Sequence, residues 1–156
     1  MIRVYTVLDL TQVIRASRIA AEKRADMTDY VSGVVLDCRQ KGSYAQPNRN
    51  ISLDAQPEKI FAVRGITGLV TFTDSGDVEE IYTLTVTPIP NKAPAICAEI
   101  PTRQWHTLLA LSDDAITCQV RPNHIAREYA KWTPKEEDAS AARRYLRELE
   151  LLFYEN

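Results

Sequence analysis

The chain has 156 residues, of which 45% are hydrophobic and 26% charged, and its formal net charge is −2. This length can bury the core of one domain, and the apolar fraction excludes a disordered chain. The near balance of charge excludes a generally basic nucleic-acid-binding surface, so we expect no nucleic-acid partner. An odd number of well-separated cysteines argues against a disulfide framework. The chain contains no apolar run of the length of a signal peptide or a membrane span. We therefore expect a cytoplasmic protein without a membrane partner.

The N-terminal segment predicts an arm over residues 1–28. Residues 2–8 have the composition of a short strand. Asp9 and Gln12 have the spacing of a capping box. Apolar residues then recur at helical spacing on one face, which predicts a helix over residues 10–24.

The middle of the chain, residues 29–122, predicts a β-barrel. Short β-branched and aromatic runs alternate there with turn residues. Turns are expected at 74–77, where Gly76 can adopt positive φ, and at 112–114. Eight short strands in this length favour a double-sheet jelly roll over an immunoglobulin sandwich. The candidate strands are residues 30–38, 42–46, 59–64, 66–73, 78–87, 95–100, 105–112 and 115–121.

The C-terminal segment, residues 123–156, predicts a loop and then a helix. Thr133 and Pro134 have the pattern of a helix start, with the cap residue three positions before Glu136. The helix carries an apolar stripe, which must be buried on the β body or on a partner chain. The partner-chain alternative would make the protein an interaction module. The stripe consists of Ala142, Tyr145, Leu146, Leu149, Leu152 and Phe153.

Two motifs resemble those of cupins. Gly42 is followed by five residues and then Asn48-Arg49-Asn50, and Glu58 is followed by six residues and then Gly65. This spacing is similar to the first cupin motif, which has glycine, His-x-His, glutamate and glycine. Residues 101–106, from Pro101 to His106, are similar to the second motif. The resemblance implies a mainly β, single-domain cupin fold, a double-stranded β-helix or jelly-roll barrel with flanking N- and C-terminal helices.

Further segments resemble the WbuC family of cupin-fold proteins over about residues 10–150. They are the Gln-Pro-x-Arg segment at Gln46, the Val-Arg-Gly strand end at Gly65, Pro-x-x-x-Trp-His-Thr at His106, and Tyr-Ala-x-Trp-x-Pro at Tyr129. The resemblance implies a link to bacterial surface-polysaccharide biosynthesis. By analogy with cupins, which commonly pair, it also implies a homodimer.

The resemblance places Asn48, Asn50, Glu58 and His106 at the positions that hold a divalent ion in metal-binding cupins. Two imidazoles are replaced by carboxamides, whose oxygens are weak ligands for transition metals. The gap before Glu58 is also longer than usual, and Arg103 replaces a turn glycine. We therefore expect no cofactor. If a weakly bound divalent metal is retained, Glu58 and His106 are the candidate ligands.

Three interpretations of the pocket remain open from the sequence. In the first, Asn48, Asn50, Glu58, His106 and Tyr44 converge in a metal-free barrel and bind a small polar, carbohydrate-related molecule. In the second, the chain is a metal-dependent cupin enzyme, of the isomerase, epimerase or dioxygenase type, with an altered site. In the third, the site is vestigial, and the asparagines satisfy nearby backbone groups. His106 and Glu58 could also form an acid–base pair, so catalysis stays open.

Four further residues have a structural and a functional interpretation. Arg49 and Arg64 suit an anionic ligand, although surface ion pairs are the more common role. Trp105 and Trp132 suit stacking on a sugar, although burial in a core or under a helix is more common.

Overall fold

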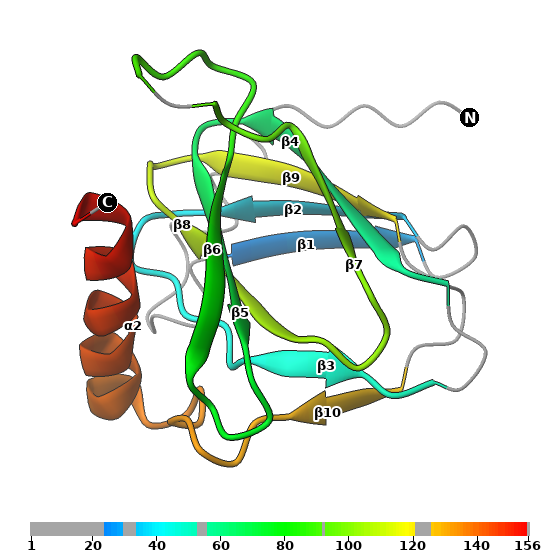
Figure 1. Cartoon of the computed structure of the whole chain (residues 1–156), viewed down its shortest axis with the longest axis vertical. Coiled ribbons are helices and arrows are strands. Elements are labelled where there is room, and N and C mark those ends of the chain that lie inside the picture. Colours follow the sequence, from blue (N-terminus) through cyan, green and yellow to red (C-terminus); the bar gives the residue numbers. More distant parts are fainter. Residues whose placement is uncertain (1–23, 30–33, 53–55, 92, 121–125, 156) are drawn as a thin grey trace.

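The computed structural model describes residues 24–29, 34–52, 56–91, 93–120 and 126–155. They form ten strands and a C-terminal helix, α2 (Ala139–Tyr154). Figure 1 shows two facing sheets with α2 outside them. The strands are β1 (Arg24–Asp29), β2 (Val34–Arg39), β3 (Asn48–Asn50), β4 (Glu58–Arg64), β5 (Thr67–Phe72), β6 (Val78–Leu84), β7 (Cys97–Ile100), β8 (Trp105–Ala110), β9 (Ala115–Val120) and β10 (Arg127–Tyr129).

The strands divide into two five-stranded sheets. Sheet A has the order β1-β2-β9-β4-β7, and sheet B has the order β10-β3-β8-β5-β6. The named strands pair antiparallel in both sheets. Strands distant in sequence are neighbours, as in a jelly roll, where the chain crosses between the sheets. The predicted mainly β jelly-roll class is therefore confirmed.

Two apolar clusters bury both faces of sheet B. The inner cluster lies between the sheets and includes Ile60, Leu69, Leu84 and Leu108. The outer cluster includes Phe72, Val70 and Leu109 of sheet B together with the apolar face of α2. Every residue of β5 and β8 is consequently buried. Strands buried on both faces lose the usual alternation of apolar and polar residues.

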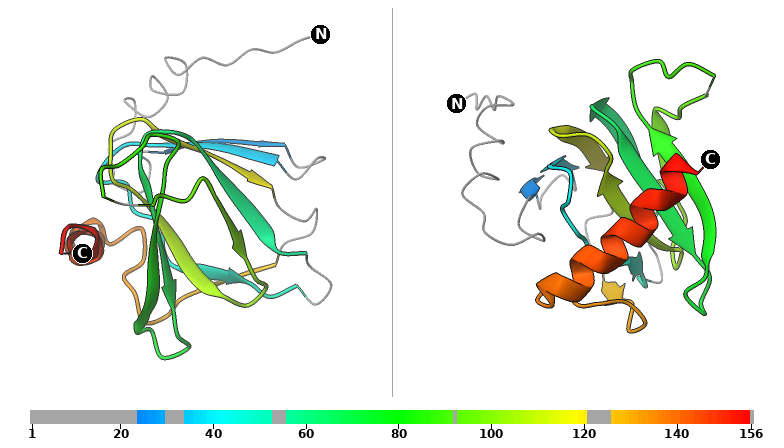
Figure 2. Two further views of the ribbon diagram at one scale, coloured as in Figure 1. Left: turned by 45° about the horizontal axis from the view of Figure 1, so that its top comes forward. Right: turned by 90° about the vertical axis from the view of Figure 1, so that its left-hand side faces the viewer.

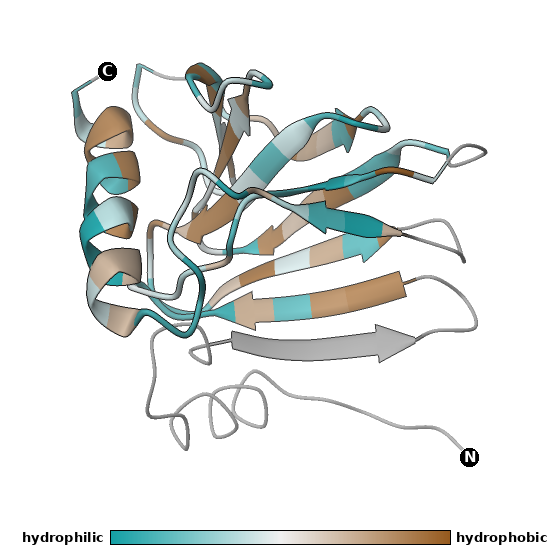
Figure 3. Cartoon of the chain, turned by 90° about the horizontal axis from the view of Figure 1, so that it is seen from below, coloured by the Kyte–Doolittle hydropathy of each residue, from teal (hydrophilic) through white to brown (hydrophobic). Residues whose placement is uncertain are grey.

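Helix α2 packs its apolar stripe on sheet B of the same chain. Ala142, Leu146, Leu149 and Phe153 are buried in the outer cluster, and Figure 2 shows the helix running along the outside of the barrel. Colouring by hydropathy shows both apolar and polar positions on this helix (Figure 3). Of the two predicted ways to bury the stripe, the structure shows packing on the β body of the same chain.

The start of α2 differs from the prediction. The N-cap is Asp138, whose side chain accepts a hydrogen bond from the backbone N–H of Ala141. Thr133 instead donates its hydroxyl to the carbonyl of Ala130, so the Thr133–Pro134 start is wrong. Within the described part of the chain, no helix combines the length and apolar character that crossing a bilayer requires.

The turns follow the prediction better than the shortest strands do. Gly76 has φ 93° in the β5–β6 turn, and Asp114 has φ 55° between β8 and β9. Residues 42–46, expected to form a strand, do not, and the three-residue strands β3 and β10 were not predicted. A segment of three residues is too short to show a period-2 pattern of apolar and polar residues. These strands can therefore be recognised only by their hydrogen-bonded pairing with neighbouring strands.

The predicted N-terminal arm is described only at its end. Arg24, the last residue of the predicted helix, instead begins β1, which pairs with β2 along its whole length. The expected strand over residues 2–8 and the rest of the helix over residues 10–24 lie outside the described residues.

Candidate functional site

A polar cavity of about 290 Å³ lies between the two sheets. Side chains from both sheets and from the segment before α2 reach it, and most of them are charged or carry amide or hydroxyl groups. The arginines and the glutamates of the lining are equal in number. The lining residues are Arg39, Ala45, Gln46, Asn48, Glu58, His106, Thr107, Leu108, Gln119, Arg127, Tyr129 and Glu136.

The wall from sheet B is a cross-strand row. Strand β3 lies between β10 and β8, with Asn48 opposite Tyr129 on one side and His106 on the other. Directly opposed residues project to the same face of a sheet, and here that face lines the cavity. The register thus brings a phenol, a carboxamide and an imidazole side by side.

The orientation of the His106 ring follows from its backbone contact. The Nδ1 atom lies 3.0 Å from the carbonyl oxygen of Gln104. A carbonyl can only accept, so Nδ1 carries the proton of this hydrogen bond. In the neutral ring the acceptor nitrogen is then Nε2.

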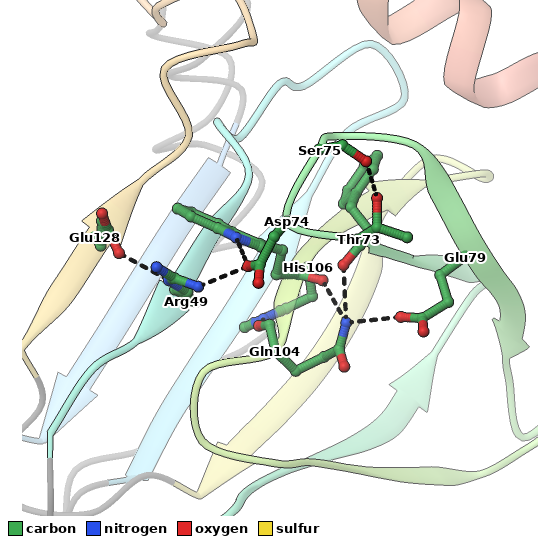
Figure 4. A network of polar contacts seen from close by, with 10 residues as sticks. Arg49, Thr73, Asp74, Ser75, Glu79, Gln104, His106 and Glu128 are labelled. Atoms are coloured by element: carbon green, nitrogen blue, oxygen red, sulfur yellow. Dashed lines mark hydrogen bonds and ion pairs between the residues drawn. The ribbon is translucent and has the colours of Figure 1, made fainter.

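The opposite face of the same strands holds a charged cluster (Figure 4). Arg49 of β3 forms ion pairs with Glu128 of β10 at 2.7 Å and with Asp74 of the β5–β6 turn at 2.9 Å. Its guanidinium lies 4.3 Å from the ring centroid of Trp105 of β8, whose indole N–H donates to Asp74. This cluster ties two three-residue strands to their neighbours, and it therefore holds the inward row in place.

Trp105, Trp132 and Arg49 have structural contacts in the barrel. Trp105 is buried in the outer cluster, and Trp132 packs against Phe72 and Trp105 at centroid distances of 5.1 and 6.1 Å. Arg49 is held by the ion pairs just described, whereas Arg64 is exposed at the end of β4.

Sheet A contributes a buried ion pair. Asp37 is 0% exposed and Arg39 is 6% exposed, and the arginine Nε donates to the carboxylate over 2.8 Å. Gln119 donates to the same carboxylate oxygen of Asp37. The Nη1 atom of Arg39 reaches across the barrel and donates to the carbonyl of Leu108 over 2.6 Å. Strand β3 begins at Asn48, which pairs with His106, and so it does not extend far enough to pair with Leu108. The Arg39 side chain therefore supplies a donor that a longer strand would have offered to the Leu108 carbonyl.

A second buried ion pair links the sheets. Glu58 of β4 is 2% exposed, and Nη2 of Arg127 lies 3.0 Å from each of its carboxylate oxygens. The Nη1 atom of the same guanidinium donates to the side-chain oxygen of Asn48. One cation thus contacts two of the residues placed at metal-ligand positions by the resemblance.

The structure brings together three of the five residues expected in the pocket. Asn48, Glu58 and His106 line the cavity, whereas Asn50 and Tyr44 are not among its lining residues. Asn50 is buried, and its side-chain oxygen accepts from the backbone N–H of Ser52.

Tyr44 lies in the outer cluster beneath α2. It donates its hydroxyl to the carbonyl of Pro134 and meets Tyr145 edge-on at 6.2 Å. Burial raises the pKa of Tyr44 to about 12, so the phenol stays protonated in this environment.

Sequence reasoning missed most of the cavity's charged and amide groups. Asp37 and Arg39 alternate with apolar residues in β2, and Thr117 and Gln119 do so in β9. Polar residues at the inward positions of barrel strands were a usable signal for Arg39 and Gln119. No local pattern marks Arg127, because its strand is recognisable only through its pairing with β3.

The residues present do not fit a cupin-type metal site. Asn48 and Glu58 are bound to a guanidinium, and the oxygen of Asn50 accepts from Ser52. Within the described residues, no three His, Cys, Asp or Glu side chains gather in a way that could hold a metal ion. The backbone nevertheless keeps the turn of the second motif, since Arg103 has φ 70° where the motif has glycine.

No family model matches the chain, and no curated protein is significantly similar to it. Among solved structures, procruciferin, an 11S globulin from Brassica napus, aligns with a TM-score of 0.51 and 10% identity over 68% of this chain and 27% of its own. An oxalate decarboxylase from Lactobacillus farciminis aligns with a TM-score of 0.46 and 12% identity over 73% and 33%. TehB from Haemophilus influenzae aligns with a TM-score of 0.38 and 23% identity over 49% and 24%.

The chain thus spans about a quarter to a third of these proteins. At such identities the likeness to procruciferin concerns the fold alone. Together with the order of the strands, it identifies the fold as a jelly roll of two antiparallel sheets, with a C-terminal helix packed on the outside of sheet B.

Proposed function

We propose that this cupin-type protein binds a small, polar, carbohydrate-related molecule in its barrel cavity and needs no metal ion to do so. The observation that carries the proposal is the convergence of Asn48, Gln119 and His106 on one cavity, which Arg39 and the Arg127–Glu58 ion pair also line. Ligand sites typically combine a concave shape with a few fixed polar groups.

The lining suits a neutral, hydroxyl-rich molecule. Carboxamides offer both donors and acceptors, and so does a sugar hydroxyl. Arg39 is paired with Asp37 and Arg127 with Glu58, so the cavity has no excess positive charge to favour an anion. A volume of about 290 Å³ lies just below the roughly 300–1,000 Å³ of ligand pockets, which favours a single sugar ring.

The biological context of the proposal rests on the resemblance to the WbuC family. That resemblance favours a role near surface-polysaccharide biosynthesis, with the ligand an intermediate or product of sugar metabolism. A metal-dependent enzyme is not favoured, because Arg127 contacts both Asn48 and Glu58.

The experiment is calorimetric titration with a panel of neutral monosaccharides, uronic acids and nucleoside diphosphate sugars. We expect saturable binding of at least one neutral sugar. Loss of one or two hydrogen bonds in Asn48→Ala or His106→Ala should weaken it about tenfold, which corresponds to about 1.4 kcal/mol. Gln56→Ala, which removes an exposed carboxamide, is the matched control and should bind like the unmodified protein. A panel without a binder, or equal affinity in all variants, would contradict the proposal.

A further inference from the structure

We propose that the guanidinium of Arg127 is the resident cation of this barrel and takes the place that a divalent ion has in metal-binding cupins. The proposal concerns the chain's own residues and is independent of which molecule the cavity binds. It explains together the burial of Glu58, the carboxamide at Asn48 and the position of β10.

Arg127 contacts three side-chain oxygens of Glu58 and Asn48. Its Nη2 lies 3.0 Å from both carboxylate oxygens of Glu58, and its Nη1 donates to the side-chain oxygen of Asn48. By the motif resemblance, these two residues stand at positions of metal ligands. A single group therefore satisfies the three oxygens that these side chains offer to a cation.

Burying the Glu58 carboxylate without a compensating positive charge would destabilise the fold. The carboxylate is 2% exposed, and a buried carboxylate needs a compensating charge and hydrogen bonds. A guanidinium supplies both and does not lose its proton in proteins. The barrel thus holds a permanent positive charge that depends on neither pH nor the supply of metal.

The side chain at position 48 is a neutral hydrogen-bond acceptor. A carboxamide is neutral at every pH and presents an acceptor oxygen to the guanidinium N–H. A histidine there would gain positive charge on protonation and repel Arg127. The replacement of imidazole by carboxamide at Asn48 is therefore what an internal arginine requires.

The pairing of β10 with β3 and an ion pair on the outer face orient Arg127 toward the cavity. Arg127 and Tyr129 line the cavity, and Glu128 between them forms its ion pair with Arg49 on the opposite face. Successive strand residues alternate between faces, so this outer ion pair fixes Arg127 inward. Strand β10 pairs with β3 over three residues, which sets Arg127 beside the segment that carries Asn48.

The test compares divalent-ion binding in the unmodified protein and in Arg127→Met, using calorimetric titrations with Mn²⁺, Ni²⁺ and Zn²⁺. We expect no saturable binding to the cavity of the unmodified protein. Arg127→Met should bind one ion at least tenfold more tightly, because Glu58, Asn48 and His106 then line a cavity without the cation. Adding Glu58→Gln to Arg127→Met should abolish the gain. Arg143→Met, on the exposed face of α2, should behave as the unmodified protein does.

Two results would overturn the proposal. One is stoichiometric metal in the unmodified protein that disappears in Glu58→Gln. The other is a folded Arg127→Met variant that gains no ion binding. If Arg127→Met does not fold, the double variant Glu58→Gln/Arg127→Met should fold, since it leaves no carboxylate without its cation. A double variant as unstable as the single one would also overturn the proposal. Sugar binding is measured separately, so failure here leaves the proposed ligand untouched.

Discussion

Replacing Arg39 by methionine should destabilise the fold strongly, although the residue lies beside a cavity. Methionine keeps the aliphatic part of the side chain but removes the guanidinium that forms the ion pair with Asp37, which is 0% exposed. Breaking a buried ion pair by removing one partner costs about 3–5 kcal/mol. The carbonyl of Leu108 also loses its donor, which adds roughly 1–3 kcal/mol if it stays unsatisfied. Allowing for relaxation and water entry, we expect about 4 kcal/mol of a total stability of roughly 5–15 kcal/mol.

The assay is urea unfolding at pH 7, followed by the fluorescence of Trp105 and Trp132. Arg64→Met is the matched control, because Arg64 is exposed at the end of β4 in the same sheet, and its effect should stay within about 0.5 kcal/mol. Asp37→Leu/Arg39→Met should recover much of the loss, since apolar replacement of both partners is often neutral. A loss below about 1 kcal/mol in Arg39→Met would refute the reasoning that this pair is a buried, mutually dependent unit.

Three further predictions concern the packing around the site. In Gly68→Ala the added Cβ would lie 2.6 Å from the ring of Phe153, so we expect a loss of about 1–3 kcal/mol in urea unfolding, and an unchanged midpoint would argue against tight docking of α2. Burial raises the pKa of the Cys38 thiol from 9.0 to about 11, so the folded state retains a proton that the unfolded state loses. The free energy of unfolding should therefore fall more steeply between pH 9 and pH 11 in the unmodified protein than in Cys38→Ala, and parallel curves would exclude this linkage. Arg49→Ala removes the outer ion pairs and the contact with Trp105, so hydrogen exchange of the β3 amides should become faster and sugar affinity should drop severalfold; full protection of β3 would show that the outer cluster does not position it.

Sequence patterns predicted best the strands that are long enough to show an enrichment in β-branched and aromatic residues. Segments 59–64, 66–73 and 105–112 correspond to β4, β5 and β8 within a residue or two. The β-branched and aromatic content of these runs reflects burial on one or both faces. Strands β3 and β10 have three residues each and take their conformation from pairing and from the Arg49 cluster, which are tertiary interactions.

The candidate site was predictable where a motif fixed the spacing and not where the fold alone brought residues together. Asn48, Glu58 and His106 follow from the motif resemblance, and all three line the cavity. Tyr44 was expected in a strand facing the barrel, but its segment is not a strand, and its side chain packs under α2. Arg127 comes from a segment expected to be a loop, so its pairing with Glu58 is visible only in three dimensions.

The central claim is that the polar cavity binds a small hydroxyl-rich molecule, and chemical-shift mapping tests it most directly. Two-dimensional ¹H–¹⁵N spectra of the unmodified protein would be recorded during titration with the tightest-binding neutral sugar of the panel. We expect saturable shifts centred on the side-chain amides of Asn48 and Gln119 and on the backbone of His106. Shifts centred on α2 or on the outer face of either sheet, or no saturable shift with any sugar, would contradict it.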